Sequence, residues 1–377
     1  MLSWILTILI SIRLLFDFMS EQERIVSQSI YFVAGLSIFS YLERRARKEQ
    51  NFEPQSITFY LVQVVLLSSI LFFCFKGLHL GYSESVIVFQ IKLLLFFFLL
   101  KWVFSLDCDT HKKLETLISL CVCVSASLSI IEYVTQSHFL STQIAPRYDS
   151  RYAGLMLWPN TSGFVYALYA IYVYSNFSVI QYALARTFLM LLAIFCAGAL
   201  LPFLTYFIVV FFLTIGTVSK LSLKVVRFVG LSFVLAITYL SGVWLRFIVS
   251  LTSLEEINPQ SNSLDWRIWH WQRLLGDWST HKFFGKGFGV SELLVDSTGY
   301  LPHNDYLRLL LDLGIVGFGL ISSLTLALIL LWKDKSSLLL NRAVISFLLL
   351  SAAGGNLMGQ SIATILIPYY LRKRCPT

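Results

Sequence analysis

The chain has 377 residues, of which 57% are hydrophobic and only 13% are charged, and its formal net charge is +8. A soluble domain cannot bury that much apolar surface, so the composition excludes the ordinary soluble classes. The positive charge fits the Lys and Arg that collect in cytoplasmic loops of membrane proteins, and it does not indicate nucleic-acid binding.

Repeated apolar runs of roughly 15–22 residues predict membrane-spanning helices. The expected fold is an all-α polytopic membrane protein with about twelve spans, in a single domain over residues 1–377. The first run has no small-residue cleavage site, so we interpret it as a retained helix. A tight turn at Pro202 is expected between the seventh and eighth spans. The predicted spans are residues 1–16, 25–42, 57–75, 84–104, 114–134, 155–175, 187–201, 203–218, 225–245, 306–332, 338–357 and 361–371.

The basic residues predict the orientation of these spans. Arg44, Arg45, Arg47 and Lys48 crowd the link between the second and third spans, which places that link and both termini in the cytoplasm. Basic residues in the later links alternate consistently with this orientation. The one long link, residues 246–303, then lies on the outer face, and a connection of that length is usually functional.

The long outer link carries two local patterns. The pattern of Trp266, Trp269 and Arg273 together with Ile268, Trp271 and Leu275 predicts a short amphipathic helix at the outer membrane interface. Gly285, Gly287 and Gly289 alternate with Lys286 and Phe288. This run lacks the strand-to-helix context of a phosphate-binding loop, so we expect a tight turn at a close backbone approach.

The cysteines predict neither a metal nor a disulfide site. Four of the six lie in apolar runs, and Cys108 and Cys375 lie in segments assigned to the cytoplasm. No Cys-x-x-Cys pair occurs, so neither a zinc site nor a disulfide framework is expected.

His303 is a candidate catalytic residue because of its position. Most lone loop histidines have no special role, but this one ends the long outer link and precedes Asn304 and Asp305, which are good helix-capping residues. At the outer membrane edge, a neutral imidazole can accept a proton from a hydroxyl near neutral pH.

Arginines on the outer face are candidates for binding phosphate. A guanidinium stays charged and can bind phosphate through two parallel hydrogen bonds, so several of them around a membrane-edge cavity suit a lipid diphosphate. The alternative is contact with lipid headgroups, which we prefer for Arg246 and Arg273. The outer arginines are Arg24, Arg147, Arg151, Arg246, Arg267, Arg273 and Arg308.

Lys92 lies in the middle of a predicted span, where a charge is expensive and often functional. A structural lysine paired with Glu132 or Asp312 is an equally good interpretation.

Three ordered motifs over about residues 147–320 resemble the O-antigen ligase and polymerase superfamily. The block His303-Asn304-Asp305-Tyr306-Leu307, followed by Asp312-x-Gly314-x-x-Gly317, is similar to its His-Asn-x-Tyr-Leu, acidic residue and Gly-x-x-Gly signature. Upstream, Arg267 with Trp269 and the glycine run resemble its long periplasmic loop. Arg151-Tyr152-Ala153-Gly154, followed by Trp158-Pro159-Asn160, is similar to its Arg-x-x-Gly and Pro-Asn block.

The resemblance implies a glycosyltransferase of the bacterial inner membrane with its active site on the periplasmic face. The donor would be a glycan on undecaprenyl diphosphate, and the acceptor would be the lipid A–core or another lipid-linked glycan. The chemistry would invert the anomeric carbon and need no metal, nucleotide or other cofactor. His303 and Arg267 would be catalytic; Arg151, Arg147, Asn160, Asn304 and Tyr306 would bind the diphosphate or glycan; Asp312, Gly285, Gly287 and Gly314 would give structural support.

The chain departs from the family pattern in one important place. Many members carry Ser-Arg in the helix after the Pro-Asn span, whereas residues 195–199 of this chain contain no arginine. Either Arg151 or Arg147 supplies that charge, or the chain is a divergent polymerase. Asp312 stands where Glu is common, which is a mild change.

Ligase and polymerase are nearly equal expectations, with a slight preference for ligase. The rival class is a transporter or flippase of lipid-linked sugars, which twelve spans also fit. The sequence lacks the paired broken helices in matching halves that such transporters tend to show. A structural membrane scaffold is a third, weaker alternative.

Overall fold

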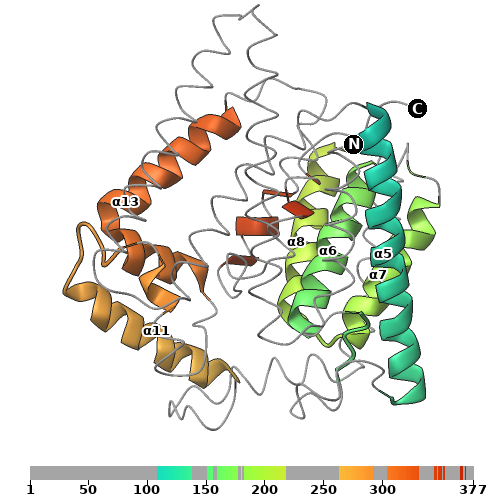
Figure 1. Ribbon diagram of the computed structural model, residues 1–377, viewed down its shortest axis with the longest axis horizontal. Helices are drawn as coiled ribbons and strands as arrows, with labels where there is room; N and C mark the ends of the chain where they lie inside the picture. Colours follow the sequence, from blue (N-terminus) through green and yellow to red (C-terminus); the bar gives the residue numbers. More distant parts are fainter. Residues whose placement is uncertain are drawn as a thin grey trace, which may run out of the picture.

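The computed structural model is all-helical over the residues that it describes, namely 108–137, 151–155, 159–176, 180, 182–217, 263–287, 289–292, 304–330 and separate positions between 344 and 370. Its elements are the α-helices α5 (Cys108–Thr135), α6 (Pro159–Ser175), α7 (Ala183–Cys196), α8 (Leu200–Thr217), α11 (Ser263–Ser279) and α13 (Asp305–Leu330), and the 3-10 helix η3 (Val290–Glu292). Figure 1 shows α5 to α8 packed together on one side, with α11 and α13 on the other.

Two described helices are long and apolar enough to cross a membrane, Cys108–Thr135 and the Asp305–Ser323 part of α13. The apolar helices Ala183–Cys196 and Leu201–Val210 are shorter. The membrane class is therefore supported. The total of twelve spans stays a prediction, since most of the other predicted spans lie outside the described residues.

The predicted spans 114–134, 155–175, 187–201, 203–218 and 306–332 correspond to α5, α6, α7, α8 and α13. The predicted amphipathic helix around residues 266–275 corresponds to α11. In each case the helix exists where the hydrophobic pattern placed it, and the ends differ by several residues.

The turn expected at Pro202 lies upstream of that residue. The Gly198 N–H donates to the Phe195 carbonyl and the Ala199 N–H to the Ile194 carbonyl, while Gly198 has a φ of 57°. These are the bonds and the left-handed residue of a Schellman motif, which ends α7. Pro202 instead lies in the first turn of α8, where its missing N–H costs nothing.

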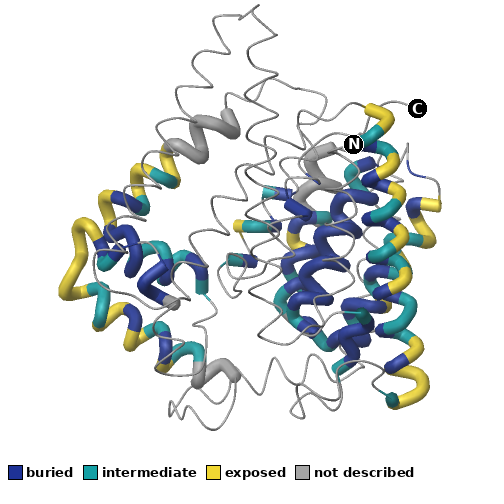
Figure 2. Tube along the Cα trace, in the orientation of Figure 1, coloured by how far each residue is buried: buried dark blue, intermediate teal, exposed yellow. Residues whose placement is uncertain are grey.

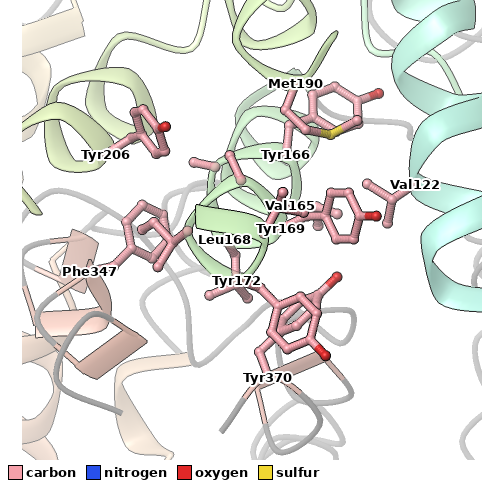
Figure 3. Packing of buried hydrophobic residues seen from close by; sticks show 14 of the residues in the cluster. Val122, Val165, Tyr166, Leu168, Tyr169, Tyr172, Met190, Tyr206, Phe347 and Tyr370 are labelled. Atoms are coloured by element: carbon pink, nitrogen blue, oxygen red, sulfur yellow. The ribbon is translucent and has the colours of Figure 1, made fainter. Parts of the chain in front are cut away.

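The core of the α5–α8 group is built around α6. Nearly every side chain of α6 from Thr161 to Val173 is buried, as expected for a helix that is apolar all round and has neighbours on every side. In Figure 2 this helix is dark blue along its length. Figure 3 shows Tyr166, Tyr169 and Tyr172 of α6 among side chains from the other helices and from the C-terminal positions Phe347 and Tyr370.

The cysteine prediction is wrong in one place, because Cys108 at the start of α5 is disulfide-bonded. Cys108 belongs to no Cys-x-x-Cys pair, so the sequence pattern does not reveal this bond. Cys121, Cys123 and Cys196 are free.

Candidate functional site

Polar side chains of α5 hold the backbone of residues 151–155, a short non-helical segment. The Gly154 N–H donates to Glu132 Oε2 over 3.0 Å, and the Leu155 N–H donates to Ser125 Oγ over 3.1 Å. Gly154 has a φ of 62°, and a Cβ on it would lie 2.1 Å from the Ser125 carbonyl oxygen. Only glycine fits this close approach.

The other side of the same segment is held by α6 and by the end of α7. The Tyr152 N–H donates to the Cys196 carbonyl over 3.1 Å, and Ser162 Oγ of α6 donates to the Ala153 carbonyl over 2.8 Å. Buried backbone groups that are paired in this way make a rigid segment. Residues 151–155 are therefore a fixed platform between three helices.

Arg151 projects from this platform onto the break between α7 and α8. Its Nε donates to the Ala197 carbonyl over 3.1 Å, and its Nη2 donates to Asn160 Oδ1 over 2.7 Å. The side chain also packs against Gly198, where a Cβ would lie 3.3 Å from Arg151 Nε. Two hydrogen bonds at different nitrogens fix the plane of the guanidinium, which is half-buried.

Sequence reasoning missed the α5 residues that hold the platform. The sequence predicts for Glu132 only a possible pairing with Lys92, which lies outside the described residues. A polar stripe on an otherwise apolar helix is the signal that could have found them, because residues three and four apart share one face. The stripe consists of Ser125, Ser129 and Glu132, all buried; Ser129 Oγ donates to the Tyr152 carbonyl.

The second group of candidate residues surrounds His303, and α13 begins there at Asp305, as the capping residues Asn304 and Asp305 predicted. The Leu307 N–H donates to Asn304 Oδ1 over 3.1 Å, so Asn304 caps the helix. The Tyr306 hydroxyl donates to the Leu349 carbonyl over 2.6 Å, which ties α13 to the C-terminal part of the chain. His303 precedes this cap and lies outside the described residues, as does Arg147.

The turn that carries Gly285 and Gly287 is hydrogen-bonded to both sides of a break in α13. Helix α13 is kinked at Gly314, whose φ of 66° and ψ of −177° are not helical. The N–H groups of Lys286 and Gly287 donate to the carbonyls of Leu311 and Asp312 at the end of the first half. The N–H groups of Ile315 and Val316 donate to the carbonyls of Lys282 and Phe283 at the start of the second half. Each broken helix end is thus capped by the turn.

This exchange of hydrogen bonds explains why glycine occupies positions 285 and 314. A Cβ on Gly285 would lie 2.4 Å from the Asp312 carbonyl oxygen, and a Cβ on Gly314 would lie 2.4 Å from the Gly285 nitrogen. Both positions have positive φ. The structure places Gly285 and Gly287 in a tight turn at a close backbone approach, which is the conformation expected from the sequence.

The buried Asp312 carboxylate fastens residues 289–291, the next part of the long link between residues 246 and 303. It accepts hydrogen bonds from the N–H groups of Gly289 (2.9 Å) and Ser291 (2.8 Å), and from Ser291 Oγ (3.1 Å). Arg308, also buried, lies 3.5 Å from Asp305 Oδ1 and 3.4 Å from Ser291 Oγ. Arg308 was noted in the sequence as an outer arginine, but its place in this charged cluster was not foreseen.

Arg267 lies on α11, which packs against α13. The side chain is half-buried. Three positions further along, His270 is buried, and burial together with the Arg273 guanidinium lowers its pKa below the usual 6.5. His270 is therefore neutral at physiological pH and serves as a packed residue of α11.

Two separate groups emerge from the described part of the chain. The structure brings Arg151 to Asn160, and it brings Asp312 to Gly285, Gly287 and Gly314. Chemically, the first group presents a fixed guanidinium, and the second fixes residues 285–291 to the helix α13. No group of three or more His, Cys, Asp or Glu with metal-binding geometry occurs among the residues described.

Part of the chain matches a known protein family. Residues 185–322 match the family model described as O-Antigen ligase. This range includes α8, α11 and η3 and most of α7 and α13. A search of curated proteins finds no match to the chain.

Proposed function

We propose that this chain, which carries a domain of the O-antigen ligase and polymerase family over residues 185–322, is an O-antigen ligase. The family belongs to polysaccharide biosynthesis, and its members are membrane enzymes that act on lipid-linked glycans. In the proposed reaction an acceptor sugar hydroxyl attacks the anomeric carbon of a glycan on undecaprenyl diphosphate. The bond from that carbon to the phosphate oxygen breaks, and undecaprenyl diphosphate leaves.

In this proposal each charged or polar group has one role. His303 takes the proton of the attacking hydroxyl. Arg267 and Arg151, with Arg147, bind the diphosphate and stabilise the negative charge that develops on it as the bond breaks. Asn160, Asn304 and Tyr306 shape the binding site. The sugar–phosphate bond of the donor is already activated, so the transfer needs no ATP.

The observation that carries the proposal is the placement of Arg151. The family pattern expects an arginine in the helix corresponding to α7, and this chain has none at residues 195–199. The guanidinium of Arg151 lies against Ala197 and Gly198 in that very segment. This contact supports the proposal that Arg151, held by Asn160 and by the Ala197 carbonyl, supplies the charge that residues 195–199 lack.

The test is a transfer assay with purified chain in lipid vesicles and a lipid-linked glycan donor. We expect Arg151→Ala and Arg267→Ala each to slow transfer by roughly 10²–10³-fold, or about 2–4 kcal/mol, if each acts like a lost oxyanion donor. Arg151→Lys keeps the charge but loses the fixed planar geometry, so it should recover only part of the rate. Arg273→Ala on α11 is the matched control and should retain activity. Full activity in correctly inserted Arg151→Ala and Arg267→Ala variants would refute these roles.

A polymerase is the second candidate within the same family, joining lipid-linked repeat units to one another. The two differ in their acceptors, and the products separate them. Loss of a ligase leaves polymer on the carrier lipid and off the lipid A–core, while loss of a polymerase leaves the core capped with a single repeat.

A flippase of lipid-linked sugars is the rival of another class. It would depend on a proton or ion gradient and would form no new glycosidic bond. Transfer in vesicles without any gradient would therefore exclude it.

A further inference from the structure

The tip of the turn that interrupts α13 is apolar and exposed. Phe283 and Phe284 have 67% and 57% of their surfaces exposed, which is high for aromatic side chains. They follow the exposed Lys282 and precede Gly285, whose close approach to α13 fixes the turn. Backbone hydrogen bonds to α13 on both sides of the tip fix the backbone of the turn.

The surface beside this tip is the apolar face of α13. Ile315, Val316 and Leu320 are exposed on the second half of the helix. The hydrogen bonds from the Ile315 and Val316 N–H groups to the Lys282 and Phe283 carbonyls place the tip against this face. The exposed aromatic tip and the exposed aliphatic face thus form one continuous apolar surface. In Figure 2 the turn and the adjoining part of α13 both carry exposed segments.

The charges of α13 show where this surface meets the bilayer. Asp305, Arg308 and Asp312 all lie before the kink and are buried within the protein. From residue 313 to residue 332 the chain has no charged residue. An exposed, uncharged helix face of this kind is what hydrocarbon contact requires. The kink at Gly314 therefore separates the charged, buried first part of α13 from its uncharged, exposed second part.

We propose that the tip of this turn, Phe283 with Phe284, inserts among the phospholipid chains of the leaflet that α13 enters at Gly314. The partner is phospholipid, since the tip continues a lipid-facing helix surface. The exposed Lys282 directly precedes the two aromatic residues, and its ammonium group can reach the phosphate headgroups while its stem follows the apolar surface. Lys286, which follows them, lies 3.9 Å from Asp277 Oδ1. This insertion holds the following glycine turn, and through it α11, at the membrane surface.

The test is photo-crosslinking of the full-length chain in nanodiscs of phosphatidylethanolamine and phosphatidylglycerol. Phe283→p-benzoylphenylalanine places a photoreactive group at the tip with little change of size. Leu320→p-benzoylphenylalanine on α13 sets the yield for lipid contact, and Gln272→p-benzoylphenylalanine at an exposed polar residue of α11 sets the reference yield outside the proposed lipid surface. Intact mass after irradiation counts covalent phospholipid adducts.

We expect the Phe283 variant to give an adduct yield comparable to that of the Leu320 variant and several times that of the Gln272 variant. A Phe283 yield equal to the Gln272 yield would overturn the proposal, and so would the absence of adducts at Leu320. Phe284→p-benzoylphenylalanine provides a second position should the first variant fold poorly. The readout involves no glycan transfer, so its failure is separate from failure of the proposed function.

Discussion

At the scale of single residues, buried polar side chains fix the backbone segments that carry the candidate site. Glu132 holds the platform that carries Arg151, and Asp312 holds residues 289–291 beside α13. Both carboxylates accept hydrogen bonds from backbone N–H groups of short non-helical segments. Burying a carboxylate costs free energy unless it accepts hydrogen bonds in this way. Burying these N–H groups without an acceptor would also cost free energy.

The Asp312 network gives a direct stability prediction. Asp312→Asn replaces an acceptor-only group by an amide, whose NH₂ would face an N–H donor of Gly289 or Ser291. We expect the free energy of unfolding of the variant to be about 1–3 kcal/mol lower than that of the wild type. Chemical denaturation in lipid or mild detergent measures this difference. Asp109→Asn, at an exposed residue paired with Lys113 on the surface, should change stability little. Equal stabilities for both variants and the wild type would contradict the role given to Asp312.

The candidate residues could be recognised from the sequence, whereas their partners could not. The motif around His303 identified Asn304 as a helix cap, and the outer arginines included Arg151 and Arg267. The contact of Arg151 with Ala197 and Gly198 depends on a segment 46 residues away along the chain. A single sequence contains no signal for such a contact.

At the scale of elements, hydrophobic pattern predicted the helices better than their breaks. Span lengths follow from the apolar runs, which are strong signals. The break after α7 is set by Gly198 and not by Pro202, because proline is tolerated in a first helical turn while a left-handed residue ends a helix. The kink in α13 is invisible to periodicity, since it depends on a turn from the outer link.

Substitution of Gly314 tests that account of the kink. Gly314→Ala would require a conformation that is almost confined to glycine, and its Cβ would lie 2.4 Å from backbone atoms of Phe283 and Gly285. We expect a loss of more than about 2 kcal/mol of unfolding free energy. Gly319→Ala in the same helix meets nothing within 4 Å and should be neutral or stabilising. Thermal unfolding of both variants in the same lipid mixture provides the comparison, and similar melting temperatures would contradict this account.

At the scale of the whole molecule, the expected architecture has both termini inside and the long link outside. The basic residues carry this expectation, and the described helices do not test it. The proposed chemistry requires it, because a lipid-linked glycan on the outer face can be reached only from that side.

Reporter fusions test the orientation. Alkaline phosphatase folds to an active enzyme only on the oxidising outer side, so truncations fused after Lys48, Asn262 and Thr377 should differ. We expect activity from the fusion at Asn262 and none from the other two, with similar amounts of each fusion in the membrane. An active fusion at Thr377 would mean an odd number of spans and would contradict the architecture.

The central claim is that the chain transfers a glycan and that His303 is the base that takes the proton of the attacking sugar hydroxyl. The most direct measurement is the surface glycolipid ladder of a deletion strain complemented with wild type, His303→Ala or the matched control His281→Ala, all at equal membrane levels. His281 is an exposed histidine of the same outer link. The account predicts that wild type and His281→Ala restore the long-chain glycolipid, whereas His303→Ala does not. A full ladder with His303→Ala would contradict the catalytic assignment and favour the flippase.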